Sequence, residues 1–394
     1  MAKLGEVCVQ ITDGSHNPPS GVEQSEYLML SSKNIDDDII TTDSPRFLSD
    51  SDYIVENKRT NVNEGDLLMT IVGTIGRVAI VPQELEGICL QRSVAVIKPN
   101  RKAVNNRYLM YQLQNMRPFL EKEARGVAQK GIYLKQVSQL DIKLPELEHQ
   151  MQIVKVLDKA SKLIFLRRQQ LAKLDELVKA RFVEMFGDPI SNPFGFKVES
   201  LQEMLDDNAI TYHLDGNHGS DYPRNEEFVE SGVSYISANC IIDDNVNLQL
   251  AKHLTEERAA KLRKGIAQDE DVLFAHNATV GPVAILHTRE TKVVLGTSLT
   301  AYRCNKQRIL PSYLKAYMQS EGFVRQYTKD MKQTTRNQVP ITAQRKYLFI
   351  VPPLSLQNRF ASFVERIDQQ KQTVQQSLEK LELMKKALMQ EYFG

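Results

Sequence analysis

The amino-acid sequence contains one arrangement twice, and this repeat limits the folds that the chain can adopt. Residues 352–394 align without a gap on residues 145–187. The residues shared in this frame include Pro145, Leu147, Gln150, Leu171, Leu174, Lys179, Ala180, Phe186 and Gly187. A second frame matches residues 66–109 to residues 271–314, with Asp66, Leu68, Thr74, Gly76, Val78, Leu90, Ser93 and Tyr108 all recurring. Such a duplication indicates a chain that binds something in two places at once.

Each repeated 43-residue segment is predicted to be one long helix. Apolar residues recur every seven positions on one side of both segments, no proline interrupts either one, and good helix formers are frequent. Pro145 and Pro352 stand just before the start, where a missing N–H does no harm, and Gly187 gives the first segment a stop. About 35 helical residues span roughly 50 Å.

An amphipathic helix of this length needs a partner, and the other copy is the simplest one. The sequence therefore predicts an antiparallel coiled coil that relates two globular modules by an approximate two-fold axis. Its seam is expected to contain Leu157, Ile164, Leu171, Leu174, Val178, Phe360, Ile367, Val374, Leu381 and Leu388. Ordinary core helices of a single domain would fit such sustained heptads poorly.

Short apolar runs between turn residues indicate strands inside each module. The runs are 67–72, 78–81 and 93–97 in the first module and 272–274, 283–286 and 299–302 in the second, whereas 107–113 and 311–318 are expected to be helical. The predicted fold class is α+β, with two globular domains alternating with two long helices. The predicted domains are a first module at 1–144, a first helix at 145–187, a second module at 188–351 and a second helix at 352–394.

Charge is divided unevenly within each module, although the net charge is only +1. Lys and Arg against Asp and Glu number 5 against 13 in residues 1–76 and 12 against 5 in residues 77–144. The second module repeats the division, with 4 against 14 in residues 188–260 and 15 against 6 in residues 261–351. A basic side on each module would suit DNA, because phosphate neutralisation supplies most sequence-independent affinity. Internal pairing of the two parts is the alternative.

Composition excludes several classes of protein. The four cysteines are scattered without short spacings, and the seven histidines show no metal-ligand spacing, so neither a disulfide framework nor a metal site is expected. The first residues lack the apolar core of a signal peptide, and no run approaches a membrane span. These features predict a cytoplasmic protein without a membrane association.

The order of motifs resembles the specificity subunits of type I restriction-modification systems. The resemblance covers nearly the whole chain and rests on residues 65–76 and 271–281, on the openings 13–16 and 215–219, and on the proline-to-glutamine starts 145–150 and 352–357. One departure is Pro282 after Gly281, where the first module has Arg77, so a basic contact there does not transfer between modules.

The resemblance implies a non-catalytic DNA reader of host defence by DNA methylation and restriction. Each target-recognition domain would read one half-site of a split, asymmetric sequence in double-stranded DNA. The partners implied are two modification (methyltransferase) subunits and the restriction (translocase and endonuclease) subunits. S-adenosylmethionine, ATP and Mg²⁺ would be bound by those partners and by no site of this chain.

Candidate DNA contacts are polar or basic residues in predicted loops, since loops on a rigid scaffold carry recognition. In the first module they are Ser15, His16, Arg77, Arg92, Ser93, Gln129 and Lys130. In the second they are Asn217, His218, His276, Asn277, Thr279, Thr297, Ser298, Arg336, Asn337 and Gln338. Arg, Asn and Gln suit base edges, while Lys and Ser more often hold phosphates. The Asp-Gly openings and the two serines could instead be turns and strand ends.

Other functions find less support in the sequence. Asn17-Pro18-Pro19-Ser20 resembles an amino-methyltransferase signature, but serine replaces the aromatic residue that would stack on a flipped base, and no glycine-rich turn for S-adenosylmethionine follows. No phosphate-binding loop ending in Gly-Lys-Ser/Thr occurs, which argues against ATP hydrolysis. A two-headed coiled-coil scaffold for proteins is the main alternative, and a system without a restriction partner is another.

Overall fold

The computed structural model describes residues 1–124, 130–331 and 337–394. By its internal contacts the chain divides into two compact units. Unit 1 consists of Met1–Arg168 and Gln376–Gly394, and unit 2 consists of Gln169–Gln375. Each unit thus contains one globular module and about half of each long helix. The predicted division into four domains follows the chain instead, and it stays a prediction.

Unit 1 has a four-stranded antiparallel sheet at its centre, in the order β2-β10-β7-β8. Its strands are β1 (Ala2–Lys3), β2 (Cys8–Asp13), β3 (Leu28–Leu30), β4 (Ile35–Asp36), β5 (Ile39–Ile40), β6 (Arg46–Phe47), β7 (Leu67–Thr70), β8 (Val78–Ile80), β9 (Cys89–Leu90), β10 (Val94–Pro99) and β11 (Asp141–Ile142). Its short helices are α1 (Leu4–Val7), α2 (Asp50–Thr60), α3 (Asn106–Asn115), α4 (Arg117–Glu123) and α5 (Leu134–Ser138), with 3₁₀ turns η1 (Ser32–Asn34) and η2 (Gln83–Leu85). A smaller sheet has the strand order β6-β3-β9, and α2 follows β6 in the chain.

Unit 2 has the same central order with two strands added, β13-β23-β20-β21-β17-β16. Its strands are β12 (Lys197–Ser200), β13 (Ile210–Asp215), β14 (Phe228–Val229), β15 (Val233–Ile236), β16 (Ile241–Ile242), β17 (Asn245–Val246), β18 (Lys252–Leu254), β19 (Ile266–Ala267), β20 (Val272–Asn277), β21 (Thr279–Ile285), β22 (Val293–Leu295), β23 (Leu299–Cys304) and β24 (Leu348–Val351). Its short helices are α7 (Leu201–Asp206), α8 (Glu256–Lys261), α9 (Pro311–Met318), α10 (Glu321–Met331) and α11 (Ile341–Gln344), with 3₁₀ turns η3 (Gly219–Asp221), η4 (Asn225–Glu227), η5 (Ala238–Cys240) and η6 (Leu248–Leu250).

The six predicted apolar strands and both predicted short helices are present, so the α+β prediction is confirmed. The inner strands β7 and β10 are buried on both faces, which explains why they read as continuous apolar runs. In β7, Leu67 and Met69 face the cluster that contains α3, while Leu68 faces a second cluster with Leu30. The second repeat divides in the same way, with Val272 and Phe274 on one face and Leu273 on the other.

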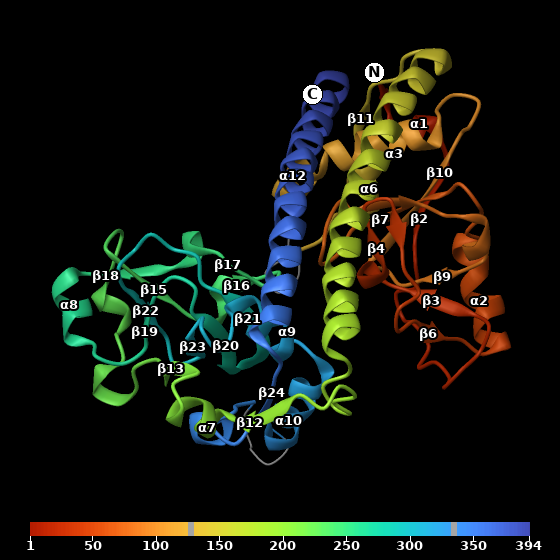
Figure 1. The fold of residues 1–394 in the computed structure, drawn as a ribbon. Helices are drawn as coiled ribbons and strands as arrows, with labels where there is room; N and C mark the ends of the chain where they lie inside the picture. The colour runs from red at the N-terminus through yellow and green to blue at the C-terminus, as the bar shows by residue number, and fades with distance from the viewer. Residues whose placement is uncertain (125–129, 332–336) are drawn as a thin grey trace. The chain divides into compact units, whose positions relative to one another are not determined.

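The two long helices are α6 (Leu147–Phe186) and α12 (Leu354–Phe393), drawn in yellow-green and blue in Figure 1. Both fall within the predicted segments and stop one residue before a glycine. A buried glutamine anchors each helix to its own module. Gln150 accepts from Asn105 N (2.8 Å) and donates to Ala103 O and Pro145 O. Gln357 makes the equivalent bonds to Leu310 N, Arg308 O and Pro352 O.

Within each unit the two helices run antiparallel. In unit 1, Arg168 near the middle of α6 pairs with Glu382 at 2.7 Å, while Lys143, just before α6, bonds the carbonyl of Gly394. In unit 2, Asp175 pairs with Lys371 and, further along α6, the ring of Phe182 meets that of Phe360. Residue numbers therefore rise along one helix as they fall along the other, as the sequence predicts.

The predicted seam residues are all buried or half-buried. In α6, Leu157 is buried against the core of unit 1 and Leu174 packs with Ile367 and Val374 in unit 2. The buried members are Leu157, Ile164, Leu174, Phe360, Ile367 and Val374. The half-buried members are Leu171, Val178, Leu381 and Leu388.

Candidate nucleic-acid interface

Four loop segments of unit 1 meet at one edge of its central sheet. Because neighbouring strands are antiparallel, the end of β2, the end of β7, the start of β8 and the start of β10 all lie at this edge. The segment 130–132 joins them, since Gly73 N donates to Lys130 O (3.2 Å) and Ile132 N donates to Ile71 O (2.9 Å). We call the segments 13–17, 71–77, 91–93 and 130–132 the loop end of unit 1.

Unit 2 builds the same edge with the same hydrogen bonds. Ala278 N donates to Asn337 O (3.0 Å) and Val339 N donates to His276 O (2.8 Å). The bond from Ile71 N to Ser93 O in unit 1 recurs as His276 N to Ser298 O, both at 2.9 Å. The segments 215–218, 276–279, 296–298 and 337–339 form the loop end of unit 2. The repeat is therefore preserved in the backbone of the loops as well as in the core.

An aspartate and a histidine three residues apart are paired at both loop ends. His16 Nε2 lies 2.7 Å from Asp13 Oδ2, and His218 Nε2 lies 2.7 Å from Asp215 Oδ2. The glycine between them is required by a close approach: a Cβ on Gly14 would lie 2.1 Å from Leu90 O. Gly216 is confined in the same way by the backbone of residues 295–296. The Asp-Gly-x-His openings are thus closely packed against neighbouring backbone at the glycine and present an exposed imidazole.

Several exposed polar and basic side chains differ between the two loop ends. In unit 1, Arg92 and Lys130 are exposed, and Arg77 is half-buried with its Nε 3.6 Å from Asp36 Oδ1. In unit 2, Asn337 is exposed, and so is Thr279, which matches the exposed Thr74 of unit 1, while Asn277, Thr297 and Gln338 are half-buried. Gln338 forms an isolated bridge with Asn277. The predicted Gln129 and Arg336 lie outside the described residues.

Five of the predicted contact residues instead hold the loops in place. The Oγ atoms of Ser93 and Ser298 accept from backbone N–H groups of Ser32 (3.0 Å) and Ala238 (2.8 Å). Ser15 is buried and its hydroxyl donates to Glu56 Oε1. The other two are Asn217, whose buried amide donates to Lys264 O, and His276, whose buried Nδ1 bonds Val339 O. Four of these side chains bond loop backbone and Ser15 bonds the carboxylate of Glu56, so all five stabilise the loops, and their contact with DNA stays a prediction.

Two basic residues that are not among the predicted contacts lie beside the loop end of unit 2. The bond from Asn217 to Lys264 O (2.8 Å) brings the segment before β19 against Gly216. The side chains of Arg263 and Lys264 are exposed there. The available signal was the basic pair followed by Gly265, but its partner lies about 50 residues earlier in the chain.

Beneath the loop end of unit 2 lies a buried polar network. Gln344 Oε1 accepts from Tyr302 OH (2.6 Å) and lies 3.1 Å from His213 Nε2, while Gln344 Nε2 donates to Thr300 and to Val339 O. Burial lowers the pKa of His213 to about 4 and also lowers the pKa of His276. Both rings are therefore neutral at pH 7. In unit 1 the strand register puts Ile11 opposite Ile97, where unit 2 has His213 opposite Tyr302.

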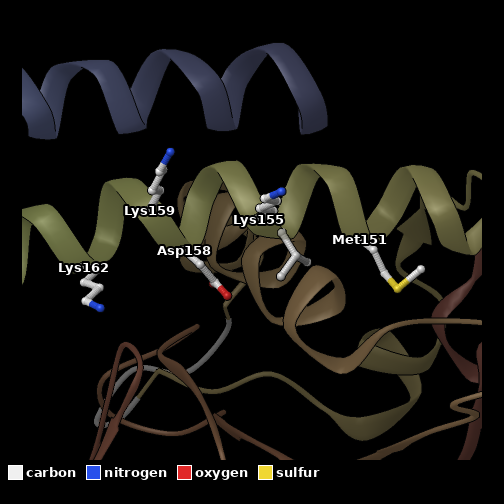
Figure 2. Close-up of a pocket in the computed structure, with 6 residues that line it drawn as sticks. Met151, Lys155, Asp158, Lys159 and Lys162 are labelled. Carbon is white, nitrogen blue, oxygen red and sulfur yellow. The ribbon is translucent and has the colours of Figure 1, made fainter.

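The helical part of unit 1 carries a shallow cavity of about 470 Å³ on α6, shown in Figure 2. It is lined by Met151, Val154, Lys155, Asp158, Lys159 and Lys162. Asp158 is held by Arg107 Nε (2.8 Å) and by Tyr111 OH (2.7 Å). Apolar side chains are also exposed on both helices of this unit. They are Met151, Leu163, Phe165 and Leu166 on α6 and Leu383 and Met384 on α12, between 43% and 68% exposed.

The described part of the chain contains neither a candidate metal cluster nor a candidate membrane-spanning helix. Its His, Cys, Asp and Glu side chains form no group of three or more that could hold a metal ion. Its helices include none that is long and apolar enough to cross a membrane. The loop ends are instead surfaces with hydrogen-bond donors and cations, a chemistry that suits an anionic polymer.

Comparison with known proteins gives a consistent result. Residues 30–176 and 209–383 both match the family described as the type I restriction modification DNA specificity domain. The type I restriction enzyme MjaVIII specificity subunit of Methanocaldococcus jannaschii is 22% identical over 342 residues, covering 85% of this chain and 80% of that protein. The crystal structure of a type I restriction-modification S subunit from M. genitalium has a TM-score of 0.56 at 13% identity, covering 100% of this chain and 95% of that one. A structure from work on assembly of the type I R-M system has a TM-score of 0.54 at 18% identity, covering 100% and 96%.

Proposed function

Because the chain belongs to the type I restriction-modification DNA specificity family, we propose that it reads a split, asymmetric DNA target with one half-site at each loop end. One observation carries this proposal: the two loop ends share their backbone hydrogen bonds but expose different side chains. A shared scaffold with different surface chemistry is what two readers of different sequences require.

The exposed groups suit DNA in kind as well as in position. Arg92 in unit 1 carries the fork that bonds guanine in the major groove, and Asn337 in unit 2 carries the amide that bonds adenine. Lys130 and Lys264 are exposed beside them and supply charge for the phosphate backbone. The two half-sites are then different, because these positions differ between the units.

We further propose that the chain has no catalytic activity and recruits subunits that do. The exposed apolar side chains of α6 and α12 in unit 1 form a surface for a modification (methyltransferase) subunit, since such patches mark protein contacts. With two repeats, two such subunits would bind, and restriction subunits would join them for cleavage. S-adenosylmethionine, ATP and Mg²⁺ would then belong to the partners.

Genome-wide adenine methylation in the native host, with and without this gene, tests the proposal. Loss of one split, asymmetric motif on deletion is the expected result, and it would give both half-sites and the spacer together. Two identical half-sites would contradict the asymmetric target. An unchanged methylome in a strain that demonstrably expresses the gene would favour the scaffold function, which predicts no salt-dependent binding to duplex DNA.

A further inference from the structure

The Asp–His pairs present an exposed imidazole at both loop ends, and the pairs agree in both sequence and geometry. Asp13 and Asp215 each lie at the end of the first strand of their sheet, opposite Ala95 and Thr300 at equivalent register positions. The histidine follows three residues later in both, with the same 2.7 Å contact. The basic and amide residues around them differ.

This contrast separates two kinds of contact. Side chains that distinguish one base sequence from another must differ between two units that read different half-sites. A side chain that is the same in both units is suited to what both half-sites have in common, and that is the sugar-phosphate backbone. The repeated histidine is therefore a candidate for phosphate and a poor candidate for base recognition.

The geometry of each pair leaves a ring nitrogen for a ligand. A carboxylate only accepts, so the Nε2 that faces it carries a proton. The Nδ1 of each ring forms no hydrogen bond with the described residues, and the His16 and His218 side chains are 55% and 54% exposed. Once Nδ1 is also protonated, the ring donates to the aspartate on one side and can donate a charge-assisted bond to an oxyanion on the other.

We propose that His16 and His218 are equivalent phosphate anchors, each held by its aspartate so that Nδ1–H donates to a backbone phosphate of its half-site. This inference rests on the proposed function, because it needs both loop ends to face DNA. The aspartates orient the rings and contact no DNA themselves. Sequence discrimination then falls to residues that differ, such as Arg92 and Asn337.

The surroundings of the two pairs are not equal. Arg59 of α2 also donates two hydrogen bonds to Asp13. Its Nη2 donates to Oδ1, and its Nε donates to the backbone O at 3.0 Å. Among the described residues, Asp215 has no second cationic partner, and the buried ring of His276, which is neutral at pH 7, lies near it. The pair in unit 1 therefore lies beside one more positive charge than the pair in unit 2, and this charge stays in place when His16 is replaced.

The test compares glutamine and lysine at both positions in the full-length chain assembled with its methyltransferase subunits. Binding is measured from 50 to 300 mM salt on a duplex with the methylome-derived target and on a scrambled duplex of equal length. His16→Gln and His218→Gln are each expected to weaken both complexes about tenfold by the same factor. Each is also expected to reduce the salt slope by about one, as loss of one phosphate contact does. His16→Lys and His218→Lys should restore the slope, because lysine keeps the charge.

His287→Gln is the matched control, since His287 is also exposed beside an aspartate (Asp269) but follows β21 at the opposite edge of the sheet. It should leave affinity and slope unchanged. Weaker binding of the target alone in the glutamine variants would assign the histidines to base reading and overturn the proposal. Unchanged affinity and slope with a lower melting temperature would show that the pairs only stabilise the loops, and this result would also overturn the proposal. Absence of salt-dependent DNA binding by the unmodified complex would instead overturn the proposed function itself.

Discussion

At the scale of single residues, unit 2 holds a histidine that should make its stability depend on pH. Burial lowers the pKa of His213 to about 4, whereas an unfolded histidine has an ordinary pKa of about 6.5. The unfolded state therefore takes up a proton at a pH where the folded state does not, so stability falls as the pH drops from 6.5 toward 4. The loss should reach about 2 kcal/mol between pH 7.5 and pH 5.

Hydrogen exchange of the amides in β13 and β23, corrected for intrinsic exchange rates, measures this loss. His213→Ile should remove about 2 kcal/mol of the pH dependence, because Ile11 holds the matching place in unit 1 without a titrating group. The amides of β2 and β10 are the internal control. Equal pH dependence in His213→Ile and the unmodified chain would mean that the histidine is not responsible.

At the scale of elements, the glutamine at the start of each long helix should contribute strongly to the free energy of unfolding of its unit. Gln150→Leu leaves one N–H and two carbonyls of half-buried residues without their partner, at a cost of about 3 kcal/mol. Calorimetry of the full chain should show a lower melting temperature for unit 1. Gln152→Leu, two residues along the same helix at an exposed position, is the control and should change stability by less than about 0.5 kcal/mol. Similar effects of the two substitutions would refute the anchoring role.

The helices also offer a surface whose removal should separate recruitment from DNA binding. Phe165→Glu and Leu383→Glu place charge on side chains that are 55% and 68% exposed in unit 1. Each should weaken association with the methyltransferase subunit at least about tenfold, because a charge in an apolar interface is costly to desolvate. DNA binding by the specificity chain itself should be unchanged. Gln370→Glu, an exposed polar position on α12, is the control. Normal assembly of both variants would place the partner elsewhere.

The same scale explains which features the sequence could predict. The strands β7, β8, β10, β20 and β23 were predictable because continuous apolar runs between turn residues are local signals. The strands Leu28–Leu30 and Cys89–Leu90 were not, because they form only through pairing between distant segments. The serines show the same limit. Ser93 reads as a free polar residue at a strand start, yet its hydroxyl accepts from Ser32, 61 positions away.

At the scale of the whole molecule, two modest contacts on one chain should act as a single strong one. The helix α6 runs without a break from Leu147 to Phe186 and contributes to both units. If the chain reads two half-sites as proposed, binding of the first turns binding of the second into an intramolecular step, which raises affinity by about 10² to 10⁴ where both can be engaged together. A duplex with one half-site scrambled should accordingly bind about 100-fold more weakly than the complete target.

The spacer between the half-sites tests whether the helices hold the two loop ends in a fixed relation. Five added base pairs turn one half-site about half a helical turn away from the other, given 10 to 10.5 pairs per turn. If the helices act as a rigid connection, this insertion lowers affinity to that of a duplex with one half-site, while five pairs added outside the target change nothing. Titration of labelled duplexes at fixed salt measures both. A chain that tolerates the insertion would be joined flexibly, and the spacer would then not be specified by α6 and α12.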